Sequence, residues 1–145
     1  MIRIICLGKL KELYLKDAVE DYTKRISKYH KIEIIELKDN EDIMIEEDQI
    51  IKYIDSKNCT ITMDITGKPI DSIGLANLID NNFNYTNNIT FIIGGSNGLT
   101  DKIKNLSNYQ ISFGNITMPH GLFRVVLLEQ IYRAFKINNH EKYHK

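Results

Sequence analysis

The chain has 145 residues, of which 43% are hydrophobic and 26% are charged, a composition typical of one soluble globular domain over residues 1–145. No apolar run approaches the ~20 residues that a membrane-spanning helix needs, and the opening apolar run is too short for a signal peptide. Both cysteines lie in apolar stretches and form no CxxC pair. We therefore expect buried free thiols in a cytoplasmic protein that makes no membrane contact.

The formal net charge is zero, but the charges are unevenly distributed. Residues 1–38 carry nine basic and six acidic side chains, residues 39–100 carry three and ten, and residues 101–145 carry seven and three. If the two basic ends meet in the fold, they form a surface suited to phosphate groups. The alternative is an evenly mixed, solvated surface, and the sequence leaves both interpretations open.

The first half of the chain alternates apolar strands with helices. Residues 2–7 form an apolar run that predicts a buried strand. From residue 10 to residue 29, apolar side chains recur every three or four positions, which predicts one face of a helix. Residues 32–37 predict a second strand, and an acidic loop then leads into a short helix over about residues 46–55. Residues 59–64 predict a third strand.

The same alternation continues in the second half. The Gly-Lys-Pro sequence at 67–69 predicts a turn, and Ser72 is the expected N-cap of the helix that follows. Residues 89–93 are the most apolar strand of the chain. Thr100 is expected to cap a short helix that ends near residue 106.

A last strand over residues 110–113 precedes the final helix. Strictly alternating strands and helices predict an α/β fold, with a parallel Rossmann-like sheet covered on both faces.

The final helix, from Pro119 and His120 to about Ile137, is apolar in nearly every direction. A helix that is apolar almost all round must be buried almost all round, so we predict that a second copy of the chain covers it in a homodimer. Arg124 lies off the single polar stripe, beside the 114–120 loop. It either faces a ligand in that loop or extends over the surface as an ordinary exposed arginine.

Three loops leave the carboxyl ends of predicted strands, where parallel sheets bind ligands. The first follows Met63, the second spans residues 94–98 and the third spans residues 114–118. The glycines at 94, 95 and 98 match neither the dinucleotide GxGxxG pattern nor a Walker loop. Taken alone they indicate a tight turn, whereas their place after a strand favours a ligand.

Residues 140–144 match HExxH, the pattern of zinc proteases. That motif needs a helix to bring both histidines onto one metal, and Asn138 and Asn139 weaken the helix just before it. We therefore predict no metal, and interpret these residues as a polar tail that folds over a neighbouring site. A frayed terminus is the alternative.

Several segments together resemble the RlmH family of small SPOUT-class methyltransferases that act on ribosomal RNA. They include FIIGGSNGL at 91–99, ITMPHGLFRVVLLEQIYRAFKI at 116–137 and YHK at 143–145. The opening IRIICLGKLKELYLKDAVEDYTKRI and TMDITGK at 62–68 also fit, so the resemblance covers essentially the whole chain. The chain departs from the family in three places. Its acidic 39–57 region is short, it has Gly114-Asn115-Ile116 where relatives often have Ser-Lys-Met, and it has His140 where a glycine is common.

The resemblance implies a SPOUT fold with a C-terminal trefoil knot and a homodimer that binds S-adenosylmethionine in the knot. The implied reaction is methylation of N3 of a pseudouridine in a stem-loop of 23S large-subunit ribosomal RNA, within the ribosome. The implied cofactor-binding residues are Met63, Gly94, Phe113, Gly114, Asn115, Ile116, Thr117 and Met118. Candidates for handling the N3 proton or its charge are Tyr143, His144, Arg133, Glu129 and Arg124.

Two rival functions remain open from sequence. One is another SPOUT RNA methyltransferase with a different target position or atom. The other is a non-catalytic, dimeric RNA-binding protein that keeps the fold. Cofactor binding followed by methyl transfer would separate the three.

Overall fold

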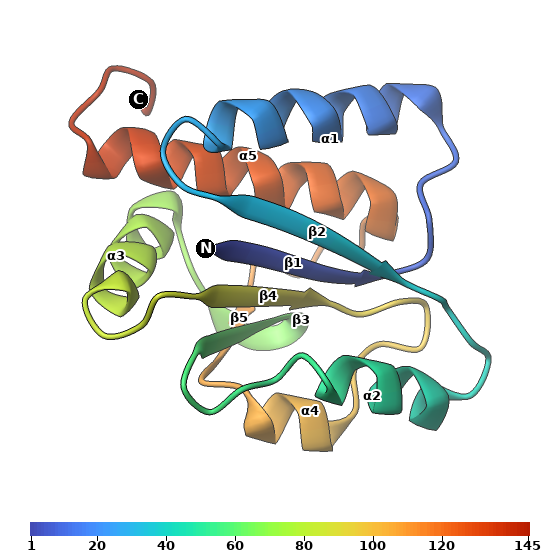
Figure 1. The fold of residues 1–145 in the computed structure, drawn as a ribbon. Coiled ribbons are helices and arrows are strands. Elements are labelled where there is room, and N and C mark those ends of the chain that lie inside the picture. The colour runs from blue at the N-terminus through green and yellow to red at the C-terminus, as the bar shows by residue number, and fades with distance from the viewer.

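Five strands form one parallel sheet in the computed structural model, which describes residues 1–145 (Figure 1). The strand order is β2-β1-β4-β3-β5, so β2 and β5 are the two edge strands of the sheet. The strands are β1 (Ile2–Leu7), β2 (Ile32–Leu37), β3 (Cys59–Pro69), β4 (Ile89–Ile93) and β5 (Tyr109–Ser112). The parallel α/β prediction is therefore confirmed.

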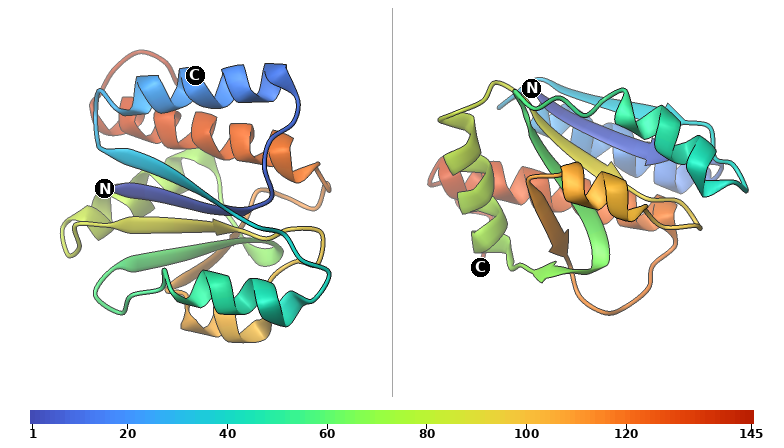
Figure 2. Two further views of the ribbon diagram at one scale, coloured as in Figure 1. Left: turned by 45° about the vertical axis from the view of Figure 1, so that its right-hand side comes forward. Right: turned by 90° about the horizontal axis from the view of Figure 1, so that it is seen from below.

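Helices cover both faces of the sheet. α1, α3 and α5 pack on one face, and α2 and α4 lie on the other, as two further views show (Figure 2). The helices are α1 (Leu13–Ile26), α2 (Ile43–Ile51), α3 (Ser72–Phe83), α4 (Asp101–Leu106) and α5 (His120–Asn138). Each strand is followed by a helix, which is why a purely parallel sheet can form.

The core has two parts because the sheet is buried on both sides. The larger cluster, under α1, α3 and α5, includes Phe91 and Leu128, both fully buried. A smaller cluster of five residues, including Ile5 and Ile92, lies under α2 and α4. Alternate residues of β4 thus point into opposite clusters, which explains why the whole 89–93 run is apolar. Both cysteines are buried and free, as expected, and burial raises the pKa of the Cys6 thiol to about 11.

The predicted turn at 67–69 is wrong, because β3 continues through these residues to Pro69. β3 pairs with β5 in two registers, first Met63 with Ile111 and then Lys68 with Ile111, so the residues between them bulge out. A Cβ on Gly67 would lie 2.8 Å from backbone atoms of Ile111. The glycine therefore allows the backbones of β3 and β5 to approach closely, and it does not form a turn.

Two helix starts also differ from expectation, and the caps explain why. The second helix begins at Ile43, earlier than predicted, because the Asp42 side chain accepts a hydrogen bond from the Met44 N–H. α3 is capped by Asp71, which accepts from the Gly74 N–H. The predicted cap, Ser72, donates instead to Gln130 on α5 at 2.6 Å.

Most of the apolar perimeter of α5 is covered inside one subunit. α5 packs between α1 and α3 over the sheet, and Leu127, Leu128, Ile131 and Ala134 are fully buried. The argument that only a second copy could bury this helix is therefore wrong. Leu122 is 41% exposed, so only the beginning of α5 keeps an open apolar side chain.

α5 ends in a Schellman motif with an unusual residue. The Glu141 N–H donates to the Lys136 carbonyl and the His140 N–H donates to the Ile137 carbonyl. His140 adopts the left-handed conformation, with φ of 57°, which usually belongs to glycine in this motif. The expected end of the helix near Ile137 is confirmed, and the chain turns sharply there.

We expect His140→Gly to stabilise the protein by about 0.5–1 kcal/mol, because glycine adopts this conformation without a Cβ clash. Chemical denaturation of both proteins would measure the difference. His140→Ala is the matched control, because it removes the imidazole but keeps the Cβ, and it should give no gain. An equal gain from alanine would show that the ring, and not the backbone, carries the strain.

None of the helices has both the length and the apolar composition to cross a membrane. The path of the chain from β5 to α5 is consistent with the trefoil knot that the resemblance implies, and the knot stays a prediction.

Candidate functional site

An open pocket of about 360 Å³ lies at the carboxyl ends of β3, β4 and β5. The three loops that the sequence singled out form its walls, in the position where parallel α/β sheets bind ligands. Its lining is half hydrophobic, and comprises Met63, Asp64, Ile65, Ile93, Gly94, Gly95, Ser96, Gly98, Leu99, Ile111, Ser112, Phe113, Gly114, Ile116, Thr117, Met118, His120 and Phe123.

The structure brings the predicted cofactor residues together with one exception. All of them line this pocket except Asn115, whose exposed side chain lies outside it. Sequence reasoning missed Asp64 and the pair His120 and Phe123. Asp64 follows Met63 directly, and His120 and Phe123 lie in the first turn of α5, directly after the 114–118 loop. Their position next to predicted residues was the available signal.

Glycines shape two walls of the pocket for different reasons. A Cβ on Gly94 would meet the Gly98 backbone at 2.9 Å, so this glycine allows the 94–98 turn to close on itself. Gly114 has φ of 121° and open space around its Cβ position, so it is required by backbone conformation alone. The 94–98 loop is therefore the tight turn that the glycines indicated, and it also lines a cavity; a ligand bound there stays a prediction.

Asp64 places a carboxylate in the pocket wall. Lys104 on α4 pairs with it at 2.5 Å, and the Thr66 hydroxyl donates to it at 2.9 Å. Burial raises the pKa of this carboxyl, but the hydrogen bonds from Lys104 and Thr66 outweigh burial and hold the pKa below its usual value. Asp64 is therefore ionised at neutral pH.

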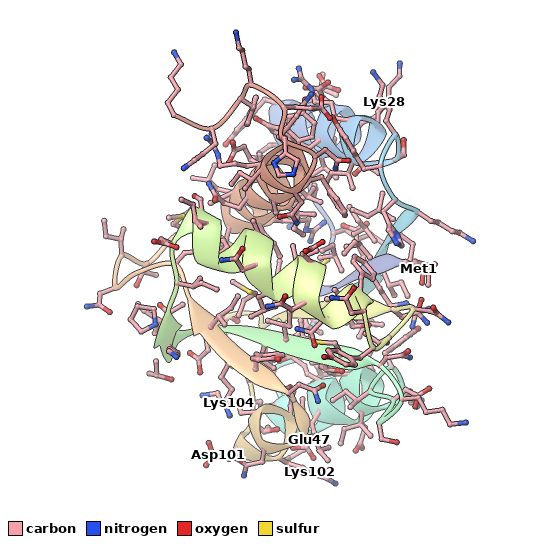
Figure 3. All side chains as sticks on the ribbon, turned by 90° about the vertical axis from the view of Figure 1, so that its left-hand side faces the viewer. Met1, Lys28, Glu47, Asp101, Lys102 and Lys104 are labelled. Atoms are coloured by element: carbon pink, nitrogen blue, oxygen red, sulfur yellow. The ribbon has the colours of Figure 1, made fainter.

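A buried acid from the acidic segment supports the glycine loop. Glu46 on α2 is 2% exposed and accepts hydrogen bonds from the Asn40 N–H and the Asn97 amide. Asn97 also donates to the Asn40 and Glu41 carbonyls. Glu47, the residue after Glu46, faces Lys102 on α4 instead, and Figure 3 shows these two side chains at the same end of the molecule. The short acidic segment thus fixes the tip of the 94–98 loop.

Four of the five candidate catalytic residues meet in one cluster on the second half of α5. Glu129 accepts hydrogen bonds from Arg133 at 2.6 Å and from the Tyr143 hydroxyl at 3.1 Å. Arg133 also lies over the Tyr143 ring, 4.7 Å from its centroid, and its Nη1 is 3.2 Å from His144 Nδ1. We call Glu129, Arg133, Tyr143 and His144 the tail cluster.

The tail cluster is held by charge and by packing. The hydrogen bond to Glu129 raises the pKa of Arg133, and burial together with Glu129 raises the pKa of Tyr143 above its usual value. The Tyr143 ring packs edge-on against Tyr132, with centroids 5.0 Å apart. Before it, Glu141 binds Lys136 and the Tyr29 hydroxyl, both at 2.8 Å. The tail is thus folded back on its own subunit, and the interpretation as a frayed terminus does not hold.

The pocket and the tail cluster lie at different places along α5. The pocket contacts the first turn of this helix, at His120 and Phe123. Glu129 and Arg133 follow six and ten residues later, about 9 and 15 Å along the axis at 1.5 Å per residue. In Figure 1 the helix runs from its start near the strand carboxyl ends to a tail on the opposite side. No residue of the tail cluster lines the pocket.

Arg124 occupies neither of the places that the sequence suggested. Its side chain is 1% exposed, so it is not a surface arginine, and it does not line the pocket. Nη1 donates to Glu36 on β2 at 2.7 Å and Nη2 donates to the Gly8 carbonyl at 3.2 Å. The guanidinium therefore ties α5 to the ends of β1 and β2. Its catalytic role stays a prediction, and the contacts favour a positioning role.

The HExxH residues do not form a helix, since His140 lies in the turn that ends α5. No three His, Cys, Asp or Glu side chains gather as a set of metal ligands. Glu141 of the motif is engaged by Lys136 and Tyr29.

Sequence comparisons show the family to which the chain belongs. A family model described as predicted SPOUT methyltransferase matches residues 1–144, and the chain belongs to this family. Within it, the chain is 46% identical to proteins named ribosomal RNA large subunit methyltransferase H from Clostridium botulinum and Clostridium tetani, over 99% of each chain. It is 42% identical to the protein of that name from Caldicellulosiruptor saccharolyticus, over the full length of both.

Among solved structures, a probable methylase family protein from Haemophilus influenzae has a similar fold, with a TM-score of 0.57. The match covers 96% of this chain and 66% of that one at 12% identity, so the likeness extends to the fold alone.

Proposed function

We propose that this protein is an S-adenosylmethionine-dependent methyltransferase of 23S large-subunit ribosomal RNA, with N3 of a pseudouridine in a stem-loop as the target atom. One observation carries the proposal: the predicted cofactor residues, apart from Asn115, line a single pocket at the carboxyl ends of three parallel strands. The names of the curated relatives support large-subunit RNA as the substrate. Because ribosomes are found in the cytoplasm, we propose that the protein acts there.

The pocket has the chemistry that the cofactor needs. Apolar side chains such as Met63, Leu99 and Met118 suit the adenine, and exposed backbone at residues 113–118 suits its hydrogen-bonding edge. The volume of about 360 Å³ lies in the range of small-molecule sites. Asp64, although paired with Lys104, is an ionised carboxylate in the pocket wall and suits a cationic ligand. When bound, S-adenosylmethionine supplies a methyl group that its sulfonium has already activated.

The residues of this chain then align the nucleophile and manage one proton. N3 of pseudouridine carries a hydrogen that must leave before the nitrogen can accept a methyl group. In the tail cluster, Arg133 stays protonated and Tyr143 has a raised pKa, so Glu129 and His144 are the members that can accept a proton. Arg133 stabilises the negative charge that develops on the base.

We further propose a homodimer in which the tail cluster of one subunit faces the pocket of its partner. The separation of the two along α5 supports this arrangement, since one subunit alone does not bring them together. Large apolar side chains also remain open near the start of α1 and α5: Leu13 is 71% exposed, Tyr14 69%, Ile116 80% and Leu122 41%. A patch of this kind at a helix pair suits a partner of the same sequence.

The dimer is tested by Leu122→Glu, which places a charge on the open side of α5 without entering the core. We expect sedimentation at micromolar concentration to show a folded monomer with little methyl transfer. Leu106→Glu on α4, a residue 50% exposed on the other face of the sheet, is the control and should leave the dimer intact. A dimeric Leu122→Glu protein, or a monomeric unmodified protein, contradicts this interface.

The cofactor site is tested by Thr117→Trp, which adds a large ring to an exposed side chain of the pocket wall. We expect calorimetry to show at least ~100-fold weaker binding of S-adenosylmethionine, because the ring occupies the cavity. Asn115→Trp adds the same bulk to a neighbouring exposed side chain outside the pocket. Unchanged affinity in Thr117→Trp, or equal losses in both variants, would place the cofactor elsewhere.

The function itself is tested with large ribosomal subunits that lack the mark. The protein and S-adenosylmethionine are added, and mass spectrometry of the digested RNA identifies the methylated nucleoside. N3-methylpseudouridine is the expected product. A different methylated nucleoside supports another SPOUT methyltransferase, and RNA binding without any transfer supports a non-catalytic RNA-binding protein.

A further inference from the structure

A second cavity, of about 530 Å³, opens at the carboxyl ends of β1 and β2 beside the proposed cofactor pocket. Lys9 and Lys11 follow β1, and Lys38 follows β2, and all three line this cavity. His120 lines both the cavity and the cofactor pocket, so the two meet at its imidazole. We call this second cavity the lysine groove.

The lysine groove carries an excess of positive charge. Lys9, Lys11 and Lys38 are exposed, and none forms an ion pair, whereas Lys102, Lys104 and Lys136 elsewhere each pair with a carboxylate. Two carboxylates line the groove. One of them, Glu36, is already bound by Arg124 at 2.7 Å and by the Leu10 N–H at 3.1 Å. Asp39 is thus the single unpaired acid facing three ammonium groups.

Phosphate is the ligand that matches this lining. Lysine ammonium groups bind phosphate oxygens as flexible point charges, and contacts of this kind are independent of the nucleic-acid sequence. The groove contains no Phe, Tyr or Trp, and its one aromatic ring is His120, at the border with the cofactor pocket, so charge and not base stacking dominates its lining. The positive end of the α5 dipole, at His120, adds to the attraction for an anion.

We propose that the lysine groove binds the RNA backbone phosphates next to the target nucleotide, so that the target base enters the cofactor pocket past His120. This inference rests on the proposed function for the identity of the RNA. The basic first third of the sequence supplies all three lysines of the groove. The position of the groove explains how this part of the chain contributes to a cofactor pocket that the last two thirds form. Phosphate contacts there fix the register of the strand but read no bases.

The test compares two triple variants with the same change in net charge. The first replaces Lys9, Lys11 and Lys38 with glutamine. The control replaces Lys31, Lys52 and Lys57, which are also exposed and unpaired but lie outside the lysine groove, before β2 and β3. The probe is a fluorescein-labelled RNA stem-loop that contains pseudouridine, and fluorescence anisotropy measures its affinity at several KCl concentrations.

We expect the groove variant to bind the RNA at least ~10-fold more weakly. The slope of its log Kd against log salt concentration should be smaller by about 2, since each lost phosphate contact lowers the slope by about 0.7. The control should differ from the unmodified protein by less than ~2-fold. Calorimetry should show normal affinity of the groove variant for S-adenosylmethionine, which separates an RNA defect from misfolding of the neighbouring pocket.

Three results would overturn the proposal: equal losses in both triple variants, unchanged RNA affinity in the groove variant, or no RNA binding by the unmodified protein. Failure of the proposed function has a different signature. In that case the RNA binds through the groove lysines with the expected salt dependence, but ribosomal subunits receive no methyl group.

Discussion

Removing residues 143–145 is expected to lower methyl transfer by at least ~100-fold, the usual scale for losing an acid–base group. The truncation removes His144, one of the two proton acceptors of the tail cluster, and the Tyr143 hydroxyl that donates to Glu129. Cofactor affinity should stay normal, because no tail residue lines the pocket. Single-turnover transfer to ribosomal subunits that lack the mark measures the rate, and calorimetry measures cofactor binding.

Point variants separate the contributions of the tail. Tyr143→Phe keeps the ring on Tyr132 and Arg133 but loses the bond to Glu129, so it should slow transfer less than His144→Gln. Deleting Lys145 alone removes one charge from the end of the chain and should have little effect. A full rate in the truncated protein would show that the tail takes no part in the reaction. Activity that depends on added zinc would restore the HExxH hypothesis.

Glu36→Gln is expected to destabilise the protein by about 2–3 kcal/mol, because it leaves the buried charge of Arg124 without a carboxylate. Arg124 is 1% exposed, and its guanidinium would keep only neutral acceptors, the Gly8 carbonyl and the amide oxygen of the new glutamine. The expected loss is smaller than the ~3–5 kcal/mol for a fully buried pair because the Glu36 side chain is 34% exposed. Urea unfolding of both proteins measures the difference.

The reverse change should cost less. Arg124→Met keeps an unbranched apolar stem, removes the guanidinium and leaves Glu36, which water can reach. The double variant should recover part of the stability lost in Glu36→Gln, because it removes the buried charge itself. If Glu36→Gln has no effect on stability, the ion pair is not what ties α5 to the sheet. Normal methyl transfer in the double variant would remove Arg124 from the catalytic candidates.

Much of the pocket could be predicted because strand-end loops in a parallel sheet follow directly from the order of the elements. Met63, Gly94 and residues 113–118 each come after an apolar run, and a sheet of five parallel strands brings such positions to one edge. The misplaced turn at Gly67 shows the limit of this reasoning. Gly-Lys-Pro is a turn signal locally, but pairing with β5 overrides it, and that pairing involves residues more than forty positions away.

The sequence by itself determined the α/β class, the family and the three loops of the strand-end pocket, because periodicity and short motifs are local properties of the chain. Only the tertiary structure decided which side chains meet. It buried Arg124 against Glu36 and covered most of α5 within one subunit. It also gathered the tail cluster away from the pocket and placed Lys9 and Lys38 beside His120. These relations depend on how helices pack across the sheet, which no spacing along one chain specifies.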